Sequence, residues 1–336
     1  MGTAVSGYGN ALNNRLTGNN LNNALDGGQG VDTMIGGLGD DIYYVDNPLD
    51  VVVENAGEGS DLIYSTVNYT LPTEVERIAL LGSTDINATG NTTANVLVGN
   101  TANNILDGKQ GADTMIGDAG NDLYYVDDPN DVIVETGNSA FDGVSSSVSY
   151  VLSANIYALT LTGTSNIDGK GNSGNNLLVG NSGNNTLHSG GGFDTLKGGA
   201  GDDFYIMDSG TIIENAGEGI DTALVYTNGY VLANNVENLI LGGISGSGNG
   251  LNNVITGNIQ NNTMTAGEGL DTLIGGAGSD TYFLAETTPV TDTIQIKEGD
   301  STLTAFDAAY NFRLSTGSSG TTDQLDLDST AIAGNT

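Results

Sequence analysis

Cysteine and tryptophan are absent from this chain of 336 residues, which holds only four prolines and one histidine. Without cysteine, no disulfide, reactive thiolate or cysteine-ligated zinc site can form. No apolar run approaches the ~20 residues that a membrane-spanning helix needs, so we expect no membrane insertion. The segment from Met1 to Gly9 lacks a basic stretch followed by an apolar one, so we also expect no cleavable signal peptide.

Basic residues are nearly as scarce. Lysine and arginine together number 7 against 41 aspartates and glutamates, which gives a formal net charge of −34. Such a chain cannot neutralise phosphate groups, so we expect no nucleic-acid partner. Its self-repulsion disfavours a compact state unless counter-ions bind, and cations are therefore the first partners to expect.

Glycine is abundant, with 52 residues, and it recurs with a period of nine. From Gly27 the chain reads Gly-Gly-Gln-Gly-Val-Asp-Thr-Met-Ile, and from Gly36 it reads Gly-Gly-Leu-Gly-Asp-Asp-Ile-Tyr-Tyr. Two preceding units are variants, in which Asn14 and Asn23 stand at the sixth position, where the later units have aspartate. Aspartate, asparagine and glycine at fixed intervals indicate a regular series of turns.

These four units form a block that recurs along the chain. The block beginning at Gly9 starts again at Gly90 and Gly171, each 81 residues further on, and once more at Gly248. We predict one continuous repeat domain over 1–300, with blocks at about 9–89, 90–170, 171–247 and 248–300. Residues 301–336 are predicted to form a C-terminal flanking or capping segment.

The eighth position of each unit is large and mostly apolar, and tyrosine closes every block. A helix needs apolar residues at three- and four-residue spacing, whereas a nine-residue spacing fits a turn followed by a short strand. We therefore predict an all-β fold, a right-handed parallel β-roll or β-solenoid with two units to each coil. The eighth positions read Leu16, Leu25, Met34, Tyr43, Leu97, Leu106, Met115, Tyr124, Leu178, Leu187, Leu196, Tyr205, Ile255, Met264, Leu273 and Tyr282.

The glycine-rich turns are the predicted metal sites. Calcium takes six to eight oxygens from carboxylates and carbonyls, and glycine allows the backbone to turn sharply. One turn supplies part of that shell, and the turn one coil away supplies the rest. The predicted calcium-site residues are Gly28, Gly30, Asp32, Gly37, Gly39, Asp41, Asp50, Gly57, Gly59, Asp61, Gly111, Asp113, Gly120, Asp122, Asp131, Asp142, Gly190, Gly192, Asp194, Gly199, Gly201, Asp203, Gly217, Gly219, Asp221, Gly267, Gly269, Asp271, Gly276, Gly278 and Asp280.

This register pairs aspartates from neighbouring coils. We expect Asp194 to lack such a partner, because the chain is shortened after Met207, and Asp292 and Asp300 are candidate partners for Asp271 and Asp280. Asn14 with Asp32 could form a weaker site. The predicted pairs are Asp32 with Asp50, Asp41 with Asp61, Asp113 with Asp131, Asp122 with Asp142, and Asp203 with Asp221.

The units resemble the calcium-binding nonapeptide repeat of RTX, or haemolysin-type, proteins. That resemblance implies several bound calcium ions and export from a bacterium by a type I route, followed by folding outside the cell. The leading interpretation is a calcium-dependent scaffold module of a large secreted or cell-surface protein. The alternatives are an adhesin or polysaccharide-binding module, and the non-catalytic domain of an exported enzyme. Self-association also stays open.

We expect no enzymatic activity from this part of the chain. The single histidine, His188, stands alone, and no nucleophile elbow or phosphate-binding loop is present. Paired carboxylates are frequent, but their positions in the turns already explain them. The tyrosines could form a sugar-stacking stripe, although core packing explains those at the eighth position better.

Overall fold

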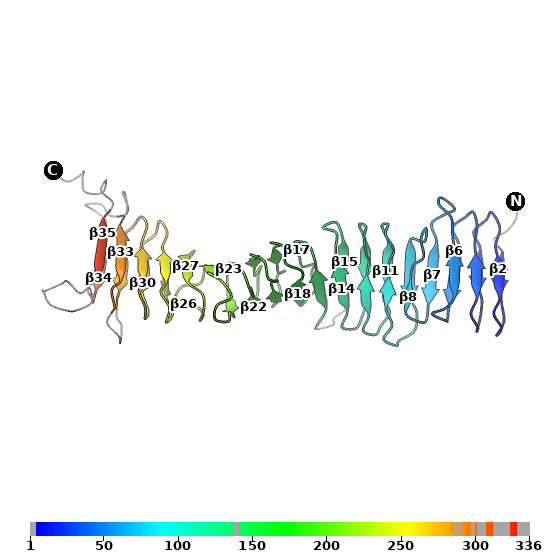
Figure 1. Ribbon diagram of the computed structural model, residues 1–336, viewed down its shortest axis with the longest axis horizontal. Helices are drawn as coiled ribbons and strands as arrows, with labels where there is room; N and C mark the ends of the chain where they lie inside the picture. The colour runs from blue at the N-terminus through cyan, green and yellow to red at the C-terminus, as the bar shows by residue number, and fades with distance from the viewer. Residues whose placement is uncertain are drawn as a thin grey trace. The chain divides into compact units, whose positions relative to one another are not determined.

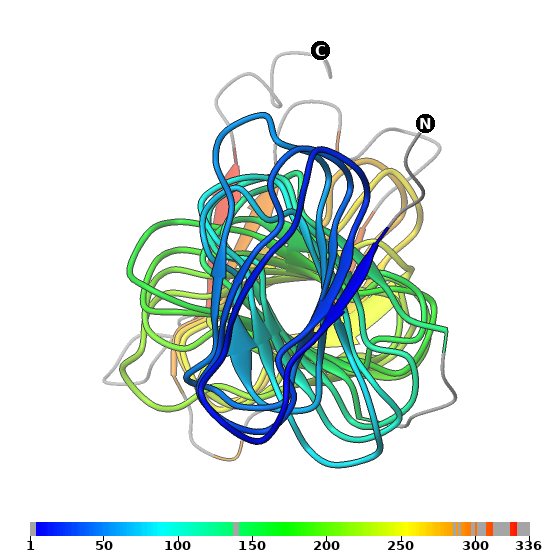
Figure 2. The ribbon, with the colours of Figure 1, turned by 90° about the vertical axis from the view of Figure 1, so that its right-hand side faces the viewer.

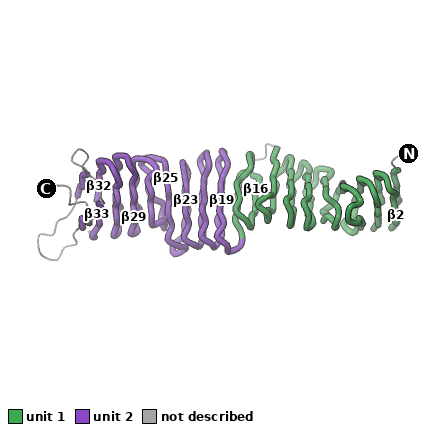
Figure 3. The backbone as a smooth tube through the Cα atoms, turned by 90° about the horizontal axis from the view of Figure 1, so that it is seen from above, with its two compact units in different colours: residues 1–162 green, residues 163–336 purple. Residues whose placement is uncertain are grey.

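The structure is a computed structural model that describes residues 5–136, 141–284, 287, 290–296, 300, 307–311 and 323–327. It divides into two compact units, unit 1 over Met1–Thr162 and unit 2 over Gly163–Thr336 (Figure 3). The described residues form strands, turns and bends without any helix, and so none that could span a membrane. The predicted all-β class is confirmed.

Unit 1 is a stack of coils, each carrying a short strand on either side of a common interior (Figure 1). Seen end on, the first coils in dark blue are flattened loops (Figure 2). On one side the strands pair in parallel in the order β1 (Ser6–Tyr8), β3 (Ala24–Asp26), β5 (Ile42–Val45), β7 (Leu62–Ser65), β9 (Arg77–Leu80), β11 (Val96–Val98), β13 (Thr114–Ile116) and β15 (Val132–Val134).

The other strands of unit 1 form two further parallel runs. The first is β2 (Arg15–Thr17), β4 (Thr33–Ile35) and β6 (Val51–Val53). The second run comprises β8 (Tyr69–Thr70), β10 (Ala88–Thr89), β12 (Ile105–Asp107), β14 (Leu123–Val126), β16 (Gly143–Ser146) and β18 (Ala158–Leu161), and β17 (Tyr150–Val151) follows β16 in the chain.

Unit 2 repeats this arrangement, again with parallel pairing. One run comprises β19 (Gly169–Lys170), β21 (Thr186–His188), β23 (Phe204–Met207), β25 (Thr222–Val225), β27 (Asn238–Leu241), β29 (Val254–Thr256), β31 (Thr272–Ile274), β33 (Thr293–Ile296) and β35 (Gln324–Leu327). The others are β20 (Leu177–Val179), β22 (Asp194–Lys197) and β24 (Gly210–Ile212), then β26 (Tyr230–Val231), β28 (Ser245–Ser247), β30 (Thr263–Thr265), β32 (Thr281–Phe283) and β34 (Ala308–Tyr310).

The register confirms a coil of two nine-residue units. Leu25 pairs with Tyr43, and Leu97 pairs with Met115, each eighteen residues further along. Side chains alternate between the two faces of a strand, so the middle residue of most three-residue strands points inward, whereas in β24 the inward residue is Ile212 at its end. Every eighth-position residue except the partly exposed Leu16 is buried, which makes the interior of each unit a column of stacked large side chains.

Coil length varies while the strand register persists. Between the blocks, Tyr43 pairs with Ile63 and Ile63 with Ile78, so the coils there hold twenty and then fifteen residues. In unit 2 the coil between Tyr282 and its partner Ala309 is much longer, at twenty-seven residues. The differences in length lie in the turns. The sixth-position residues of successive coils therefore stay aligned even where a coil is longer or shorter than eighteen residues.

Candidate metal centre

The sixth-position residues of neighbouring coils are joined by hydrogen bonds into what we call the carboxylate ladder. The backbone N–H of Asn23 donates to Asp41 Oδ1 at 2.6 Å, and the N–H of Asp41 donates to Asp61 Oδ1 at 2.8 Å. The ladder thus brings together the aspartate pairs that the sequence predicts. The same bond links Asp32 to Asp50, Asp113 to Asp131, Asp122 to Asp142, Asp203 to Asp221 and Asp271 to Asp292.

Two positions of the ladder depend on coil length. Asp194 lies opposite Gly210, and its N–H donates to the Ser209 carbonyl at 3.3 Å, so the expected loss of an aspartate partner is what the structure shows. For Asp280 the suggested partner Asp300 is wrong. Its N–H donates to Asp307 Oδ1 at 2.9 Å, because the long coil before β34 carries the chain past Asp300.

The ladder aspartates are buried, and one oxygen of most of them lacks a hydrogen bond. Their exposed fraction is 5% or less, except at the partly exposed Asp307. The one ion pair recorded in the described part of the chain joins Lys109 and Asp107, away from these carboxylates. A buried carboxylate is costly unless a proton or a cation neutralises it. The oxygens that lack a partner are Oδ2 of Asp32, Asp41, Asp61, Asp113, Asp122, Asp194, Asp203 and Asp280.

A first-position glycine lies against six of these eight carboxylates, whereas the units of Asp61 and Asp194 begin with Ala56 and Ser189. A Cβ on Gly36 would collide with Asp41 Oδ2 and with the Tyr43 hydroxyl, so the site needs glycine for space. The sequence analysis missed the first-position glycines as site residues, although they are the first letter of the repeat. The same crowding against a sixth-position Oδ2 occurs at Gly27, Gly108, Gly117, Gly198 and Gly275.

The predicted turn glycines serve two purposes. At Gly59 and Gly219 the backbone angle is ordinary, and a Cβ would instead meet the carbonyl of the neighbouring coil, at Gly39 or Gly201. The others need the left-handed region, where a side chain is strained. Those with positive φ are Gly28, Gly30, Gly37, Gly39, Gly57, Gly111, Gly120, Gly190, Gly192, Gly199, Gly201, Gly217, Gly267, Gly269, Gly276 and Gly278.

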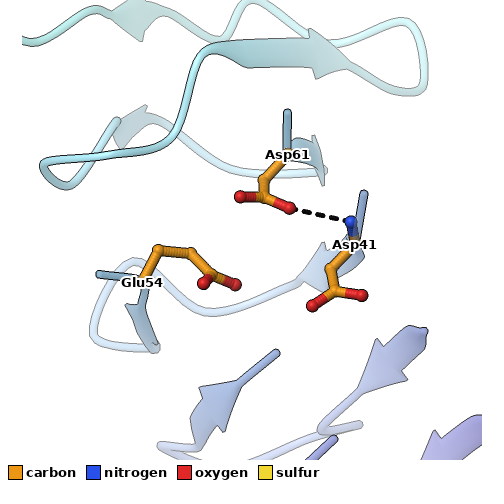
Figure 4. A group of neighbouring side chains, drawn as sticks. All are labelled: Asp41, Glu54 and Asp61. Carbon is orange, nitrogen blue, oxygen red and sulfur yellow. Dashed lines mark hydrogen bonds between the residues drawn. The ribbon is translucent and has the colours of Figure 1, made fainter. Parts of the chain in front are cut away.

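Three glutamates that the sequence analysis missed join the ladder. Glu54 lies in the turn one coil beyond Gly36, and its carboxylate points toward those of Asp41 and Asp61 (Figure 4). One oxygen from each of the three lies within 4.8 Å of the others. We call these groups the three-carboxylate clusters, and the other two are Asp122, Glu135, Asp142 and Asp203, Glu214, Asp221.

A signal for these glutamates was present in the sequence. Glu54 stands eighteen residues after Gly36, at a position where most units have glycine, and Glu135 follows Glu54 by the 81-residue block period. Glycine marks the metal turns of the repeat, so the motif alone does not predict a ligand where glutamate replaces it. The recurrence of this glutamate in the first three blocks is the clue that the sequence offers.

The tyrosines that close the blocks reach into the same clusters. The Tyr43 hydroxyl donates to Glu54 Oε1, and the Tyr124 hydroxyl donates to Glu135 Oε2 at 2.6 Å. The Tyr205 hydroxyl is fully buried and has no hydrogen-bond partner. Core packing was the predicted role of these rings, and their burial confirms it. Their hydroxyl groups add a polar rim to the carboxylates.

Burial and mutual repulsion raise the pKa values of these acids. Burial first, and then the charges of Asp61 and Asp41, raise the pKa of Glu54 to about 8. Burial raises the pKa of Asp122 and of Asp203 to about 7, with hydrogen bonds from Asn104 and Asn185 opposing the shift. Without a cation, each cluster therefore holds protons near neutral pH. A divalent ion would replace those protons.

The asparagine units are closed differently. Asn104 Oδ1 accepts the N–H of Asn100 at 2.8 Å, and its Nδ2 donates to the Ile86 carbonyl of the preceding coil at 2.6 Å. Asn185 bonds in the same way to Asn181 and Ile167. In these turns the asparagine Nδ2 hydrogens bind the carbonyl of the preceding coil. In an aspartate turn, a cation would provide the positive charge instead. We call the first kind the asparagine turns, although in the first block the buried Nδ2 of Asn23 has no hydrogen-bond partner.

The donor set suits calcium. Hard carboxylate oxygens, a flexible glycine backbone and acids with unsatisfied oxygens match a cation that accepts six to eight oxygen ligands, whereas magnesium demands a rigid octahedron and keeps its waters. The single histidine, His188, lies outside the three clusters, and its Nδ1 accepts the N–H of Gly190 at 3.0 Å.

Comparison with known proteins supports the same ligand. A sequence model of the RTX calcium-binding nonapeptide repeat matches four segments, residues 8–43, 89–124, 170–208 and 247–282. No curated protein matches the chain. Each matched segment ends at or just beyond the tyrosine that closes a block, so it contains the lower aspartates of the ladder, while their partners, such as Asp50 and Asp61, lie beyond it. The chain therefore carries four copies of the RTX calcium-binding nonapeptide repeat, and calcium is its ligand.

Proposed function

We propose that the chain is a calcium-dependent structural scaffold within a large secreted or cell-surface bacterial protein, exported by a type I-like route. The observation that carries the proposal is the carboxylate ladder. Its buried Oδ2 atoms lack hydrogen bonds, and the one ion pair recorded among the described residues, Lys109 with Asp107, does not involve them. The acids of the ladder all lie in turns that join neighbouring coils. Their positions are therefore explained by a structural role, without a catalytic one.

Folding and calcium binding form one event in this proposal. Facing aspartates repel in the absence of metal, and three-residue strands bury little apolar surface each. Because the ligands come from two coils, they are close together only in the folded state, so the free energy of binding is also free energy of folding. A chain that is unfolded where calcium is scarce and folded where it is plentiful suits passage through an export channel.

The proposal assigns calcium to the turns named from the sequence, through their aspartates and the carbonyls that their glycines expose. It also treats residues 1–300 as one continuous solenoid and 301–336 as a flanking segment. Strands β34 and β35 pair onto β32 and β33, which supports a solenoid that reaches into that flank. Most of the flank lies outside the described residues.

The experiment is far-UV circular dichroism during a calcium titration of the calcium-depleted chain, with magnesium as the control. A cooperative gain of β-structure with calcium alone is expected. A full β-spectrum in excess chelator would refute coupled folding, because the asparagine turns and the apolar column would then suffice to hold the fold.

A second candidate is polysaccharide binding, and one observation favours it. Tyr44 and Tyr64 stand on the outer face of β5 and β7, and their rings are stacked with centroids 5.5 Å apart and an interplanar angle of 24°. Tyr44 is 40% exposed. Such a pair presents a flat apolar surface with hydroxyl groups at its edge, which suits a sugar ring.

A glycan array in the presence of calcium tests this second candidate. Saturable binding that is lost in Tyr44→Ala would support it. Tyr125→Ala is the matched control, because Tyr125 is 41% exposed at the equivalent position but pairs across the coil with Ser145 instead of a tyrosine. Silence across all glycans would leave the scaffold role alone.

A further inference from the structure

We propose that Glu54, Glu135 and Glu214 are direct calcium ligands, and that the three-carboxylate clusters bind calcium more tightly than the turns that hold only aspartates. This inference rests on the proposed calcium-dependent scaffold and specifies which of its sites are strong. The repeat motif itself has glycine, not glutamate, at this position, so the glutamates are a feature of this chain's own blocks.

The distances within the clusters fit one ion. Calcium–oxygen bonds are about 2.4 Å long, so two oxygens on the same ion can be at most about 4.8 Å apart. One oxygen each from Asp41, Glu54 and Asp61 meets that limit, and so do the equivalent sets in the other two clusters (Figure 4). Three carboxylates converge on one point in three separate places, although the coils that carry them differ in length.

The buried atoms of the clusters point to a missing partner. Glu54 and Glu214 are each 7% exposed, and Oε2 of both lacks a hydrogen bond. In the third cluster the Tyr205 hydroxyl also lacks one, and it lies beside Asp203 Oδ2 over Gly198. A glutamate side chain buried for packing alone would leave these oxygens unsatisfied at a considerable cost. A cation among them satisfies all of them at once.

In the aspartate-only turns of Asp32 and Asp113 the lower acid also has an Oδ2 without a hydrogen bond, but the acid of the upper turn does not. Asp50 Oδ1 accepts the N–H of Asp32 at 2.9 Å, and its Oδ2 accepts the N–H of Asn47 at 3.2 Å. The Asn47 amide also donates to the Gly30 carbonyl, an oxygen that calcium would otherwise use. The acid of the upper turn is therefore already satisfied by the backbone, and less is left to attract an ion. Asp131 repeats this pattern with the N–H groups of Asp127 and Asp128.

Isothermal titration of the full chain with calcium alone measures the number and strength of the sites. The wild type should show a tight class of three ions above a weaker class. Glu54→Gln should weaken one tight site at least tenfold, and the triple Glu→Gln variant should lose the tight class. Glu74→Gln is the matched control. It removes the same charge from compact unit 1, but Glu74 lies outside the three-carboxylate clusters.

Terbium gives a second readout that does not depend on the stoichiometry. This ion replaces calcium, and with no tryptophan in the chain its emission must be sensitised by tyrosine. Tyr43→Phe, Tyr124→Phe and Tyr205→Phe together should remove most of the emission if the tight ions lie in the clusters. The aspartate-only turns of Asp32, Asp113, Asp194 and Asp271 have methionine or leucine at the eighth position, so ions there would contribute little. The turn of Asp280 has Tyr282 beside Asp307, so an ion there accounts for residual emission.

Each outcome separates the two proposals. Circular dichroism at saturating calcium first establishes that a glutamine variant is folded, and Glu54→Asp offers a milder change that keeps the charge but shortens its reach. Unchanged tight binding in the folded triple variant would overturn the glutamate assignment while leaving the calcium scaffold intact. A wild-type chain that neither binds calcium nor folds with it would instead overturn the scaffold.

Discussion

At the scale of single residues, space decides where an ion can lie. The first-position glycines are required because a Cβ would collide with the carboxylate, whereas most of the second- and fourth-position glycines are required by a positive φ. Gly36 shows the first requirement most clearly, because its missing Cβ leaves room for Asp41, Tyr43 and Glu54 together. A methyl group there must displace at least one of them.

Gly36→Ala is therefore expected to destabilise the folded chain by about 1 to 3 kcal/mol, as overpacking of a filled interior does. It should also weaken calcium binding at the first cluster, because Asp41 and Glu54 are forced apart. Urea unfolding at saturating calcium checks the first effect, and calcium titration checks the second. Gly250→Ala is the control, since a Cβ at this exposed glycine meets nothing within 4 Å. Equal midpoints for the two variants would contradict the argument.

The contacts between aspartates of neighbouring coils can be predicted from the sequence where the spacing of the turns determines them. Asp41 and Asp61 are separated by a coil of twenty residues rather than eighteen, yet their turn pattern aligned them correctly. Prediction failed for Asp280, because a coil of unusual length offers no pattern with which to choose Asp307 over Asp300. It failed for Glu54, because the identity of a residue does not say whether its side chain points into a turn or out of it.

At the scale of the turn, the chain uses two ways to join one coil to the next. The asparagine turns supply amide hydrogens to the carbonyls of the preceding coil, as Asn104 does to Ile86. The aspartate turns present carboxylate oxygens that need a cation. The second, third and fourth blocks therefore begin with turns closed by amide hydrogen bonds and continue with turns whose carboxylates need a cation. The folded asparagine coils can then offer a platform on which calcium completes the next coil.

Asn104→Ala and Asp122→Ala should separate these two mechanisms. Asn104→Ala removes a buried donor and a buried acceptor, which should cost about 2 to 4 kcal/mol at any calcium concentration that supports folding. Asp122→Ala removes a ligand instead. For each site saturated with calcium, a tenfold rise in the free calcium concentration adds about 1.4 kcal/mol to the free energy of unfolding. Asp122→Ala should lose the contribution of its own site to that increase.

Urea unfolding at two calcium concentrations a factor of ten apart provides the measurement. The difference between the two midpoints should match the wild type in Asn104→Ala and be smaller in Asp122→Ala. If Asn104→Ala also lost calcium dependence, the asparagine turn would belong to a metal site, and the division between the two kinds of turn would be wrong.

At the scale of the whole molecule, charge decides when the chain folds. A formal charge of −34 opposes compaction, and much of it is carried by acids that folding buries. The apolar column supplies the same interior at every pH and calcium level. Depending on the pH and the calcium concentration, the ladder carboxylates are neutralised by protons, by calcium or not at all. The stability of the fold is therefore linked to both concentrations.

The sign of the pH effect follows from the raised pKa values. The pKa of Glu54 and of Glu214 is about 8, and that of Asp113 is about 7, against ordinary values of 4.5 and 3.8. The folded, metal-free chain thus holds protons that the unfolded chain has released. Its free energy of unfolding should be largest below about pH 4 and fall as the pH rises toward 8.

Circular dichroism in calcium-depleted buffer should accordingly show more β-structure at pH 5 than at pH 8, and the calcium concentration needed to reach the full β-spectrum should rise with the pH, because the metal-free fold loses stability as its buried carboxylates lose their protons. Sodium chloride at pH 8 is the control. Salt screens exposed charges but hardly reaches buried ones, so it should not reproduce the effect of acid. If salt did reproduce it, general repulsion over the surface, rather than the buried ladder, would be what calcium relieves.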